Sequence, residues 1–237
     1  MADPSAPGTK RGAPVVLAFD TTGSACSAAV AHNDNVLAQE RREMRHGHAE
    51  NLLPMIDRVM ARAGLTPAAI GIVVVSVGPG GFTGIRAGLA AAHGLALASG
   101  ARLLGVSSFA SVAAPLPISD IDAKILVALD SRRTDFYVQL FDRAGEVLSA
   151  PAAVSPEQLA AWVGVGEIIV AGDAATAAAA VLEKDRRIQV LANSAPDACG
   201  LLAAVRRWPE RADPAARPLY LRPPDVSFPK PRRSIGR

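Results

Sequence analysis

The sequence predicts an α/β fold built from two similar halves, and three observations lead to this prediction. The chain has 237 residues, and 50% of them are hydrophobic, which provides a large core and excludes global disorder. Aromatic residues make up only 4%, whereas 47 residues are alanine, a composition that favours close-packed helices over an all-β sandwich. Short apolar runs that end in turn residues alternate with longer helical patterns, as in α/β proteins.

The first half begins with three short strands and continues with alternating helices and strands. An apolar run at 15–19 ends at Asp20, and turn residues separate it from further strands at 25–31 and 36–38. Hydrophobic periodicity then predicts a helix at 48–63, a strand at 70–77, a helix at 84–99, a strand at 102–106 and a helix at 107–114.

The second half repeats this order. A strand at 125–129 ends at Asp130, and the elements that follow are strands at 135–141 and 146–148, a helix at 155–163, a strand at 167–171, a helix at 174–184, a strand at 187–192 and a helix at 196–207. Each half is therefore βββαβαβα, the order of the ribonuclease-H-like fold that the actin, Hsp70 and sugar-kinase (ASKHA) superfamily contains in duplicate.

This repeat also sets the expected domain boundaries. We expect ribonuclease-H-like domains at 15–114 and 125–221, joined by a linker at 115–124 that contains Pro115 and Pro117. A disordered leader at 1–14 precedes them, and a basic, proline-rich tail at 222–237 follows.

Charge and cysteine content limit the functions of the chain. The tail carries a net charge of +4 and the whole chain +3, so the rest has −1 and does not support a generic nucleic-acid-binding surface. The sequence shows neither a secretory signal nor an apolar run long enough for a transmembrane helix. Two isolated cysteines suit a reducing compartment, so we expect a cytoplasmic protein.

A glycine-rich segment at 78–84 is the main candidate for a ligand site. In the ASKHA superfamily, an acidic residue after the first strand and glycine-rich turns hold the phosphates and metal of a nucleotide. The corresponding candidates here are Asp20, Thr21, Gly78, Gly80, Gly81, Thr83 and Gly84. The segment is neither a Walker A motif nor a Rossmann fingerprint, and a strand-to-helix turn that needs glycine only for its backbone is an equally good interpretation. For the counterpart at 172–174, packing is the preferred interpretation.

No catalytic or metal-binding set of residues stands out. His46 and His48 lack the i, i+4 spacing of a helical zinc pair, and no GxSxG nucleophile motif is present. A peptidase function is therefore not supported, because the sequence offers neither a nucleophile motif nor zinc ligands. A stand-alone actin-fold ATPase or small-molecule kinase, using Asp20, Asp130 and the Gly80 loop, is the alternative function. We expect no bound metal and no required cofactor, with at most weak binding of ATP or ADP.

Two helices of the first half carry apolar or small residues over more of their surface than one core needs. This surplus predicts a contact with another chain. The interface residues would be Leu52, Met55, Ile56, Val59 and Met60 in the first helix, and Ala87, Gly88, Ala91 and Leu95 in the second. The partner would be a related chain or, in its absence, a second copy.

Several of these segments resemble the bacterial TsaB (YeaZ) family. They are AFDTTGSACSAAV, HAENLLPMIDRVMARAGL, VSVGPGGFTGIRAGLAAAHGLA and LLGVSSFASVA, with GPGGFTGIR the most specific part. The resemblance covers most of 15–149, and the end at 218–222 is similar to the proline-tyrosine-x-arginine close of the family.

The resemblance implies a role in forming N6-threonylcarbamoyladenosine at position 37 of tRNAs that read codons starting with adenine. Family members partner TsaD, an actin-like subunit that carries the metal and transfers the group from threonylcarbamoyl-AMP, and the ATPase TsaE joins them. TsaD-like chains have two metal-binding histidines where this sequence has 107–111 and no histidine. The implied function is a non-catalytic scaffold, not an enzyme on its own, which meets tRNA only through the complex.

Overall fold

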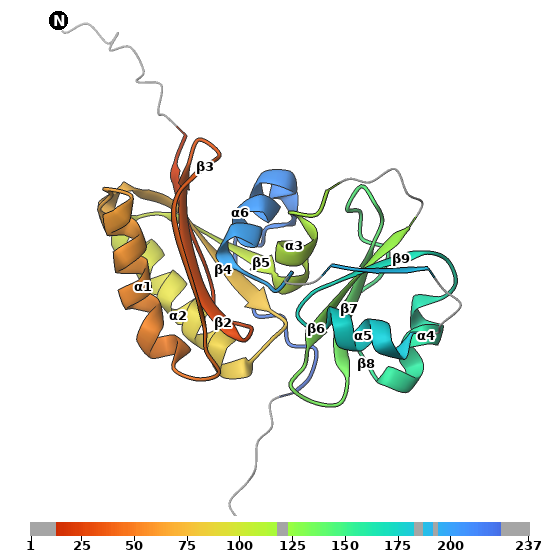
Figure 1. Ribbon diagram of the computed structural model, residues 1–237. Coiled ribbons are helices and arrows are strands. Elements are labelled where there is room, and N and C mark those ends of the chain that lie inside the picture. The colour runs from red at the N-terminus through yellow and green to blue at the C-terminus, as the bar shows by residue number, and fades with distance from the viewer. Residues whose placement is uncertain (1–12, 118–122, 183–186, 192–193, 224–237) are drawn as a thin grey trace, which may run out of the picture.

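The computed structural model describes residues 13–117, 123–182, 187–191 and 194–223, which form two five-stranded mixed sheets (Figure 1). Nearly all of the expected leader and tail, and half of the expected linker, lie outside the described residues. No helix in the described part of the chain is both long and apolar enough to cross a membrane.

The first sheet has the strand order β3–β2–β1–β4–β5. The strands are β1 (Val15–Asp20), β2 (Ala25–His32), β3 (Asn35–Glu43), β4 (Ile70–Gly78) and β5 (Arg102–Ser107). β1, β2 and β3 pair antiparallel through short turns, whereas β4 and β5 run parallel to β1 because helices connect them. α1 (His48–Arg62), the short helix η1 (Pro67–Ala69) and α2 (Phe82–Ser99) lie in these connections.

Alternate residues of β1 enter different cores, because successive side chains of a strand point to opposite faces. Leu17 and Phe19 pack with Met55 of α1 and Ile85 of α2 on the outer face of the first sheet. Ala18 instead belongs to a central core that reaches both sheets.

The second sheet repeats the topology, in the order β10–β9–β6–β7–β8. Its strands are β6 (Lys124–Asp130), β7 (Phe136–Phe141), β8 (Ala152–Val154), β9 (Ile168–Ala171) and β10 (Ile188–Val190), and its outer helices are α4 (Pro156–Val163) and α5 (Ala175–Val181). The predicted duplicated ribonuclease-H-like α/β fold is confirmed by these two equivalent sheets.

α3 (Ser108–Ala113) and α6 (Ala198–Arg207) pack against each other between the two sheets (Figure 1). Phe109 and Leu201 share the central core with Val74 of the first sheet and Val127 of the second. α6 belongs to the second half in sequence but lies on the first sheet, where the Ala198 backbone N–H donates to Ser27 Oγ at 2.9 Å. The chain then forms η2 (Pro209–Arg211) and bridges to β5 through Asp213.

The predicted third strand of the second half, at 146–148, is wrong: the strand that pairs with β7 beyond the turn is Ala152–Val154. Val147 forms only an isolated bridge with Phe141. The pairing then stops because the Ser149 hydroxyl accepts the Leu140 N–H at 2.9 Å, in place of a backbone carbonyl.

β3 continues to Glu43, well past the predicted end at 38, because its polar outer residues still pair with β2 through the backbone. Parts of the predicted elements at 174–184 and 187–192 fall outside the described residues.

Candidate functional site

Asp20 lies at the end of β1 and is 1% exposed, within a cluster of hydroxyl groups. Its Oδ1 accepts the Thr22 backbone N–H at 2.8 Å and the Thr22 hydroxyl at 3.0 Å. The Thr22 Oγ1 lies 3.1 Å from Ser108 Oγ, which in turn lies 3.0 Å from Ser76 Oγ. Burial raises the pKa of Asp20 above its ordinary value, although these hydrogen bonds oppose the shift. The carboxylate therefore faces its own neighbours and not an open cleft.

The glycine-rich segment packs directly on the turn between β1 and β2. The Gly81 N–H donates to Thr22 O at 2.8 Å, and the Thr21 hydroxyl donates to Gly84 O at 2.7 Å. A Cβ atom at Gly80 would lie 2.4 Å from Thr22 O, and one at Gly84 would lie 2.0 Å from Thr21 O. Both positions need glycine for this backbone contact.

The other predicted residues of this segment differ in exposure. Gly78 is buried beneath Ile85, whereas Thr83 is exposed and Gly81 is half-buried. Gly81 and Thr83 line a hollow of about 460 Å³ beside the start of α1, together with His46 and Arg132. The structure thus brings the predicted residues into one region, but most of their contacts are with other parts of the chain, above all with Thr22.

In the matching region of the second half, Asp130 and Asp173 make internal contacts and also line a hollow of about 360 Å³. The Asp130 N–H donates to Asp173 Oδ1 at 2.9 Å, and Asp130 Oδ1 accepts the Arg132 N–H at 2.7 Å. A Cβ at Gly172 would lie 2.0 Å from Ala128 O. Burial, and to a smaller extent the charge of Asp130, raises the pKa of Asp173.

The two histidines near α1 do not form a pair. His48 is buried with its Nε2 3.2 Å from Gly23 O, and burial lowers its pKa, whereas His46 is exposed. Among the described residues, no group of three or more histidine, cysteine, aspartate or glutamate side chains is arranged to hold a metal ion.

The end of the chain contributes to this region, which the sequence reasoning did not assign to the site. The Leu219 N–H donates to Val77 O at 2.8 Å, and the Tyr220 ring lies 5.1 Å from that of Phe82. Arg222 then forms an ion pair with Asp135 in the β6–β7 turn, so the segment joins the two halves. The 218–222 motif was the sequence signal that could have predicted this placement.

The five α1 residues predicted to bind a partner lie in the core of the first half. Leu52, Met55, Ile56, Val59 and Met60 are at most 3% exposed and pack with β1, β2 and β4. Gly88 of α2 is also buried, whereas Ala87, Ala91 and Leu95 are half-buried.

The outward surface of the same two helices is apolar in places. Leu53 of α1 is 49% exposed and Leu97 of α2 is 87% exposed. The exposed residues beside them on α2 include Ala90, Gly94 and Ala98.

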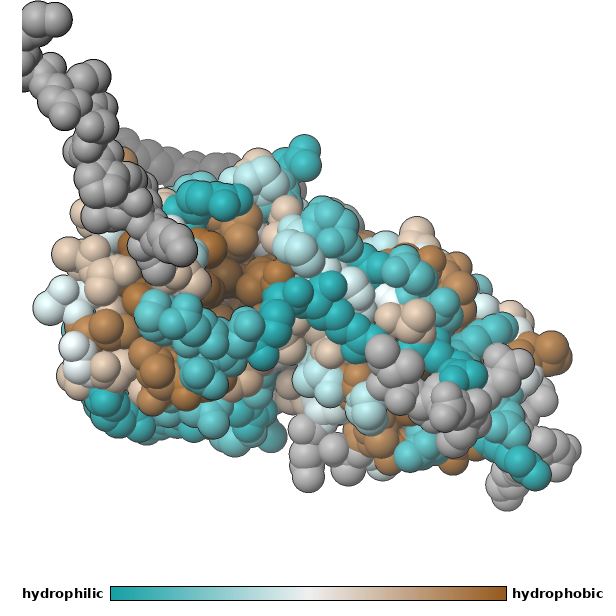
Figure 2. All heavy atoms as spheres, turned by 90° about the horizontal axis from the view of Figure 1, so that it is seen from above, coloured by the Kyte–Doolittle hydropathy of each residue, from teal (hydrophilic) through white to brown (hydrophobic). Residues whose placement is uncertain are grey.

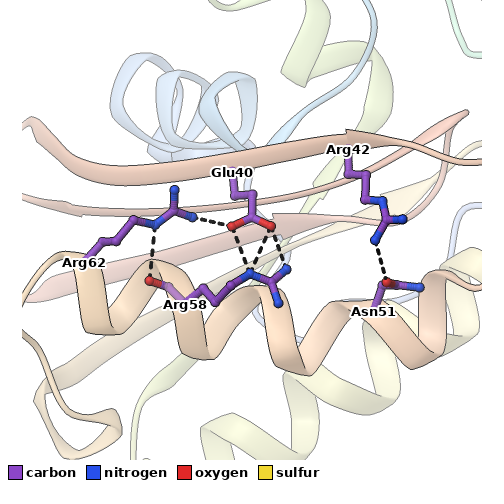
Figure 3. Close-up of polar contacts among 5 residues, drawn as sticks. All are labelled: Glu40, Arg42, Asn51, Arg58 and Arg62. Atoms are coloured by element: carbon purple, nitrogen blue, oxygen red, sulfur yellow. Dashed lines mark hydrogen bonds and ion pairs between the residues drawn. The ribbon is translucent and has the colours of Figure 1, made fainter.

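One flank of α1 is fixed to β3 by charged residues, as Figure 3 shows. Glu40 forms ion pairs with Arg58 and Arg62, and the Arg42 guanidinium donates to Asn51 Oδ1 at 3.2 Å. The Arg58 hydrogen bond holds the pKa of Glu40 below its ordinary value. This flank is engaged within the chain, which leaves the opposite surface of α1 for other contacts.

A separate hollow of about 490 Å³ opens at the other end of the first sheet, where hydrophobic atoms gather around a depression (Figure 2). Its aliphatic walls include Val16, Ile72, Leu104 and Leu202. It lies at the start of β5, whereas the glycine-rich segment lies beside the end of that strand, so the two regions are distinct.

Comparisons with known proteins identify the family of the chain. A family model described as TsaD, tRNA N6-adenosine threonylcarbamoyltransferase, matches residues 35–207. An uncharacterised protein of Mycobacterium tuberculosis is 35% identical over 217 residues, 89% of this chain and 93% of that protein. The Escherichia coli tRNA threonylcarbamoyladenosine biosynthesis protein TsaB is 30% identical over 54% of this chain and 55% of its own length. The solved structure of YeaZ from Pseudomonas aeruginosa superposes with a TM-score of 0.74 and 27% identity, covering 88% of this chain and 100% of that one.

Proposed function

The chain belongs to the TsaD family as a member of its TsaB (YeaZ) type, and on this premise we propose that it is a non-catalytic scaffold in the formation of N6-threonylcarbamoyladenosine on tRNA. It would support a TsaD-like transferase subunit, and a TsaE-like ATPase would join the assembly. The relatives named TsaB support the pathway, and the contacts of the site support the non-catalytic role.

The closed state of the Asp20 region is the observation that carries the non-catalytic role. The Asp20 carboxylate accepts hydrogen bonds from Thr22, and the glycines that would surround a phosphate instead contact the Thr21 and Thr22 backbone. α3, where TsaD-like chains have metal-binding histidines, presents Ser108 and Ser111, whose hydroxyls bond within the chain. Around Asp20 and in α3, these contacts occupy the groups that would otherwise be available to activate a nucleotide.

The outward α1–α2 surface is the proposed partner interface. Exposed Leu53 and Leu97 offer apolar anchors, and the small residues Ala90, Gly94 and Ala98 permit a second helix to approach closely. A related actin-like subunit would present equivalent helices, so two such pairs can assemble around a near-twofold axis. Without that partner, the same surface would support a homodimer.

Leu53→Glu and Leu97→Glu test this interface, since both side chains lie outside the core. Leu148→Glu and Val165→Glu are matched controls in the second half, because Leu148 is 50% exposed and Val165 is 87% exposed. We expect each α1–α2 variant to weaken binding of the TsaD-like partner by about tenfold or more, since a desolvated charge costs at least ~1.4 kcal/mol. Met55→Glu is unsuitable, because it places a charge in the core.

The readouts are pull-down with the TsaD-like subunit, size-exclusion chromatography of the chain alone and tRNA modification in a reconstituted system. The control variants should behave like the wild type in all three. Full-strength partner binding and normal modification by both α1–α2 variants would place the interface elsewhere.

A further inference from the structure

Three arginines and three aromatic residues line one hollow where the two halves meet. The hollow has a volume of about 170 Å³ and is lined by residues 79–82, 131–133, 137 and 219–223. Its cations are Arg132 and Arg133 of the β6–β7 turn and Arg222 of the C-terminal segment. None of the lining residues is acidic, and Asp135, which pairs with Arg222, is itself buried. Because the charge of Arg222 is offset by Asp135, Arg132 and Arg133 carry the net positive charge of this hollow.

Two of these aromatic residues, Phe82 and Tyr220, form a small platform, whereas Tyr137 is buried. The Phe82 and Tyr220 rings lie 5.1 Å apart, and the Arg86 guanidinium lies 3.7 Å above the Phe82 ring. Tyr220 is 37% exposed, so its ring is accessible from solvent. Aromatic rings beside guanidinium groups are the combination on which nucleic-acid bases stack while the phosphates are neutralised.

The chain leaves the described residues at this same place. Pro223, the last described residue of the C-terminal segment, lines the hollow. The sequence beyond it contains Lys230, Arg232, Arg233 and Arg237 against the single acid Asp225. A basic sequence thus continues directly from a basic surface.

We propose that Phe82, Arg132, Arg133, Tyr220 and Arg222, the arginine–aromatic surface, bind a single-stranded segment of RNA. The arginines contact its phosphates, and exposed bases stack on the aromatic pair. The hollow is smaller than the roughly 300–1,000 Å³ of pockets that enclose a small ligand, so it fits part of a polymer better than a whole free nucleotide.

The proposal goes beyond the scaffold function, and it differs from the sequence-based expectation that tRNA meets this chain only through the complex. The body of the chain has a net charge near zero, but the structure concentrates arginines at one junction. Local charge, rather than net charge, determines where a phosphate backbone binds.

The experiment measures binding of a fluorescently labelled oligouridine of about 12 nucleotides, a length within the site sizes of single-strand binders. Fluorescence anisotropy of the full chain, without partners, is recorded over a range of salt concentrations. Arg132→Glu/Arg133→Glu is compared with Arg102→Glu/Arg187→Glu, which makes the same change in charge. Arg102 begins β5 at the opposite end of the first sheet, and Arg187 precedes the β10 strand of the second.

We expect the Arg132/Arg133 variant to bind the RNA at least about tenfold more weakly, with a salt slope smaller by about 1.4, because each phosphate contact contributes about 0.7. The control pair should match the wild type. Tyr220→Ala should bind at least about fivefold more weakly with an unchanged salt slope, because it removes stacking and no charge. Circular dichroism checks that every variant is folded.

Two results would overturn the proposal. One is wild-type binding by the Arg132/Arg133 variant together with loss of binding in a chain ended at Pro223, which would assign RNA binding to the tail alone. The other is equal competition by oligoglutamate and unlabelled RNA, which would indicate a site for acidic proteins. Leu97→Glu changes the proposed partner interface and should bind RNA normally. Failure of the RNA-binding proposal is therefore distinguishable from failure of the proposed partner interface.

Discussion

Gly84 and Gly94 lie in the same helix, α2, but have opposite surroundings. A Cβ at Gly84 would meet the Thr21 carbonyl oxygen at 2.0 Å, whereas a Cβ at Gly94 would have nothing within 4 Å. We expect Gly84→Ala to lower the free energy of unfolding by about 1–3 kcal/mol or more through this clash. Gly94→Ala should raise it by about 0.5–1 kcal/mol, because alanine favours a helix interior.

Urea denaturation of the two variants measures this difference directly. Equal stabilities would mean that the glycine-rich segment does not pack on the β1–β2 turn, and an open phosphate-binding loop would then be the better description. The two substitutions add the same methyl group to one helix, so their difference isolates the contact with Thr21.

Asp20 provides a pH-dependent prediction. Its folded-state pKa is raised by burial, so the folded state binds more protons than the unfolded state in the pH range just above the ordinary value of 3.8. Wild-type stability should therefore fall as the pH rises through that range. Asp20→Asn removes this effect and keeps an oxygen to accept the Thr22 N–H.

Thermal unfolding at about pH 4 and pH 7.5 tests this prediction. The Asn variant should gain stability relative to the wild type at the higher pH, by about 2–4 °C in Tm for each kcal/mol. The opposite result would contradict the prediction: if the Asn variant loses stability relative to the wild type as the pH rises from 4 to 7.5, the fold favours the charged carboxylate.

At the residue level, the sequence predicted which residues cluster but not what they contact. Asp20 and the glycines of 78–84 do lie together. Their partners, Thr21 and Thr22, are more than fifty residues away from the glycines in sequence, so only the fold shows that the cluster is filled by its own backbone. The sequence also did not predict which α1 side chains are exposed, because an apolar pattern does not show whether Met55 faces the core or a partner.

At the element level, the C-terminal segment after η2 holds the two halves together. Arg222 pairs with Asp135, which is 4% exposed and also accepts the Ser131 hydroxyl at 2.8 Å. Arg222→Met should lower the free energy of unfolding by about 1–3 kcal/mol, because it leaves a buried carboxylate without its cation. Asp135→Asn/Arg222→Met should recover part of that loss.

A double-mutant cycle by urea denaturation gives the coupling energy between the two side chains. Additive losses in the two single variants would show that the ion pair does not join the halves. The sequence did not predict this role, because the pairing depends on the segment crossing from the first half to the β6–β7 turn. It also did not predict β8, since the Ser149 side chain interrupts pairing that hydrophobicity alone continues.

At the level of the whole molecule, the order of strands and helices was sufficient to predict the duplication. Each half needed its own sheet, and helical connections made β4 and β9 parallel to the first strand of their sheets. The position of α6 was not predictable in this way. α6 belongs to the second half in sequence but packs on the first sheet with α3, so the two halves share a central core.

This shared architecture resembles that of nucleotide-dependent enzymes, yet we expect the lone chain to bind Mg-ATP with a Kd on the order of 1 mM or weaker and to show no steady hydrolysis. At both places where an ASKHA enzyme would hold phosphates, the glycines pack on other backbone of the chain. The glycines of the first half contact the Thr21 and Thr22 backbone, and the 172–174 turn packs on Ala128. Asp130 and Asp173 are joined by a hydrogen bond, and the described residues contain no metal-holding cluster.

Isothermal titration with Mg-ATP and a phosphate-release assay test this expectation on the purified chain. Asp20→Asn is the control, because Asp20 is the carboxylate that an ATPase of this fold would use and the substitution should leave the protein folded. Micromolar affinity with steady turnover that disappears in the Asn variant would contradict the prediction. The stand-alone ATPase or kinase function would then replace the scaffold. Turnover that persists unchanged in the Asn variant would show that it does not depend on Asp20, and Asp130→Asn would then distinguish the second carboxylate of this fold from a contaminating enzyme.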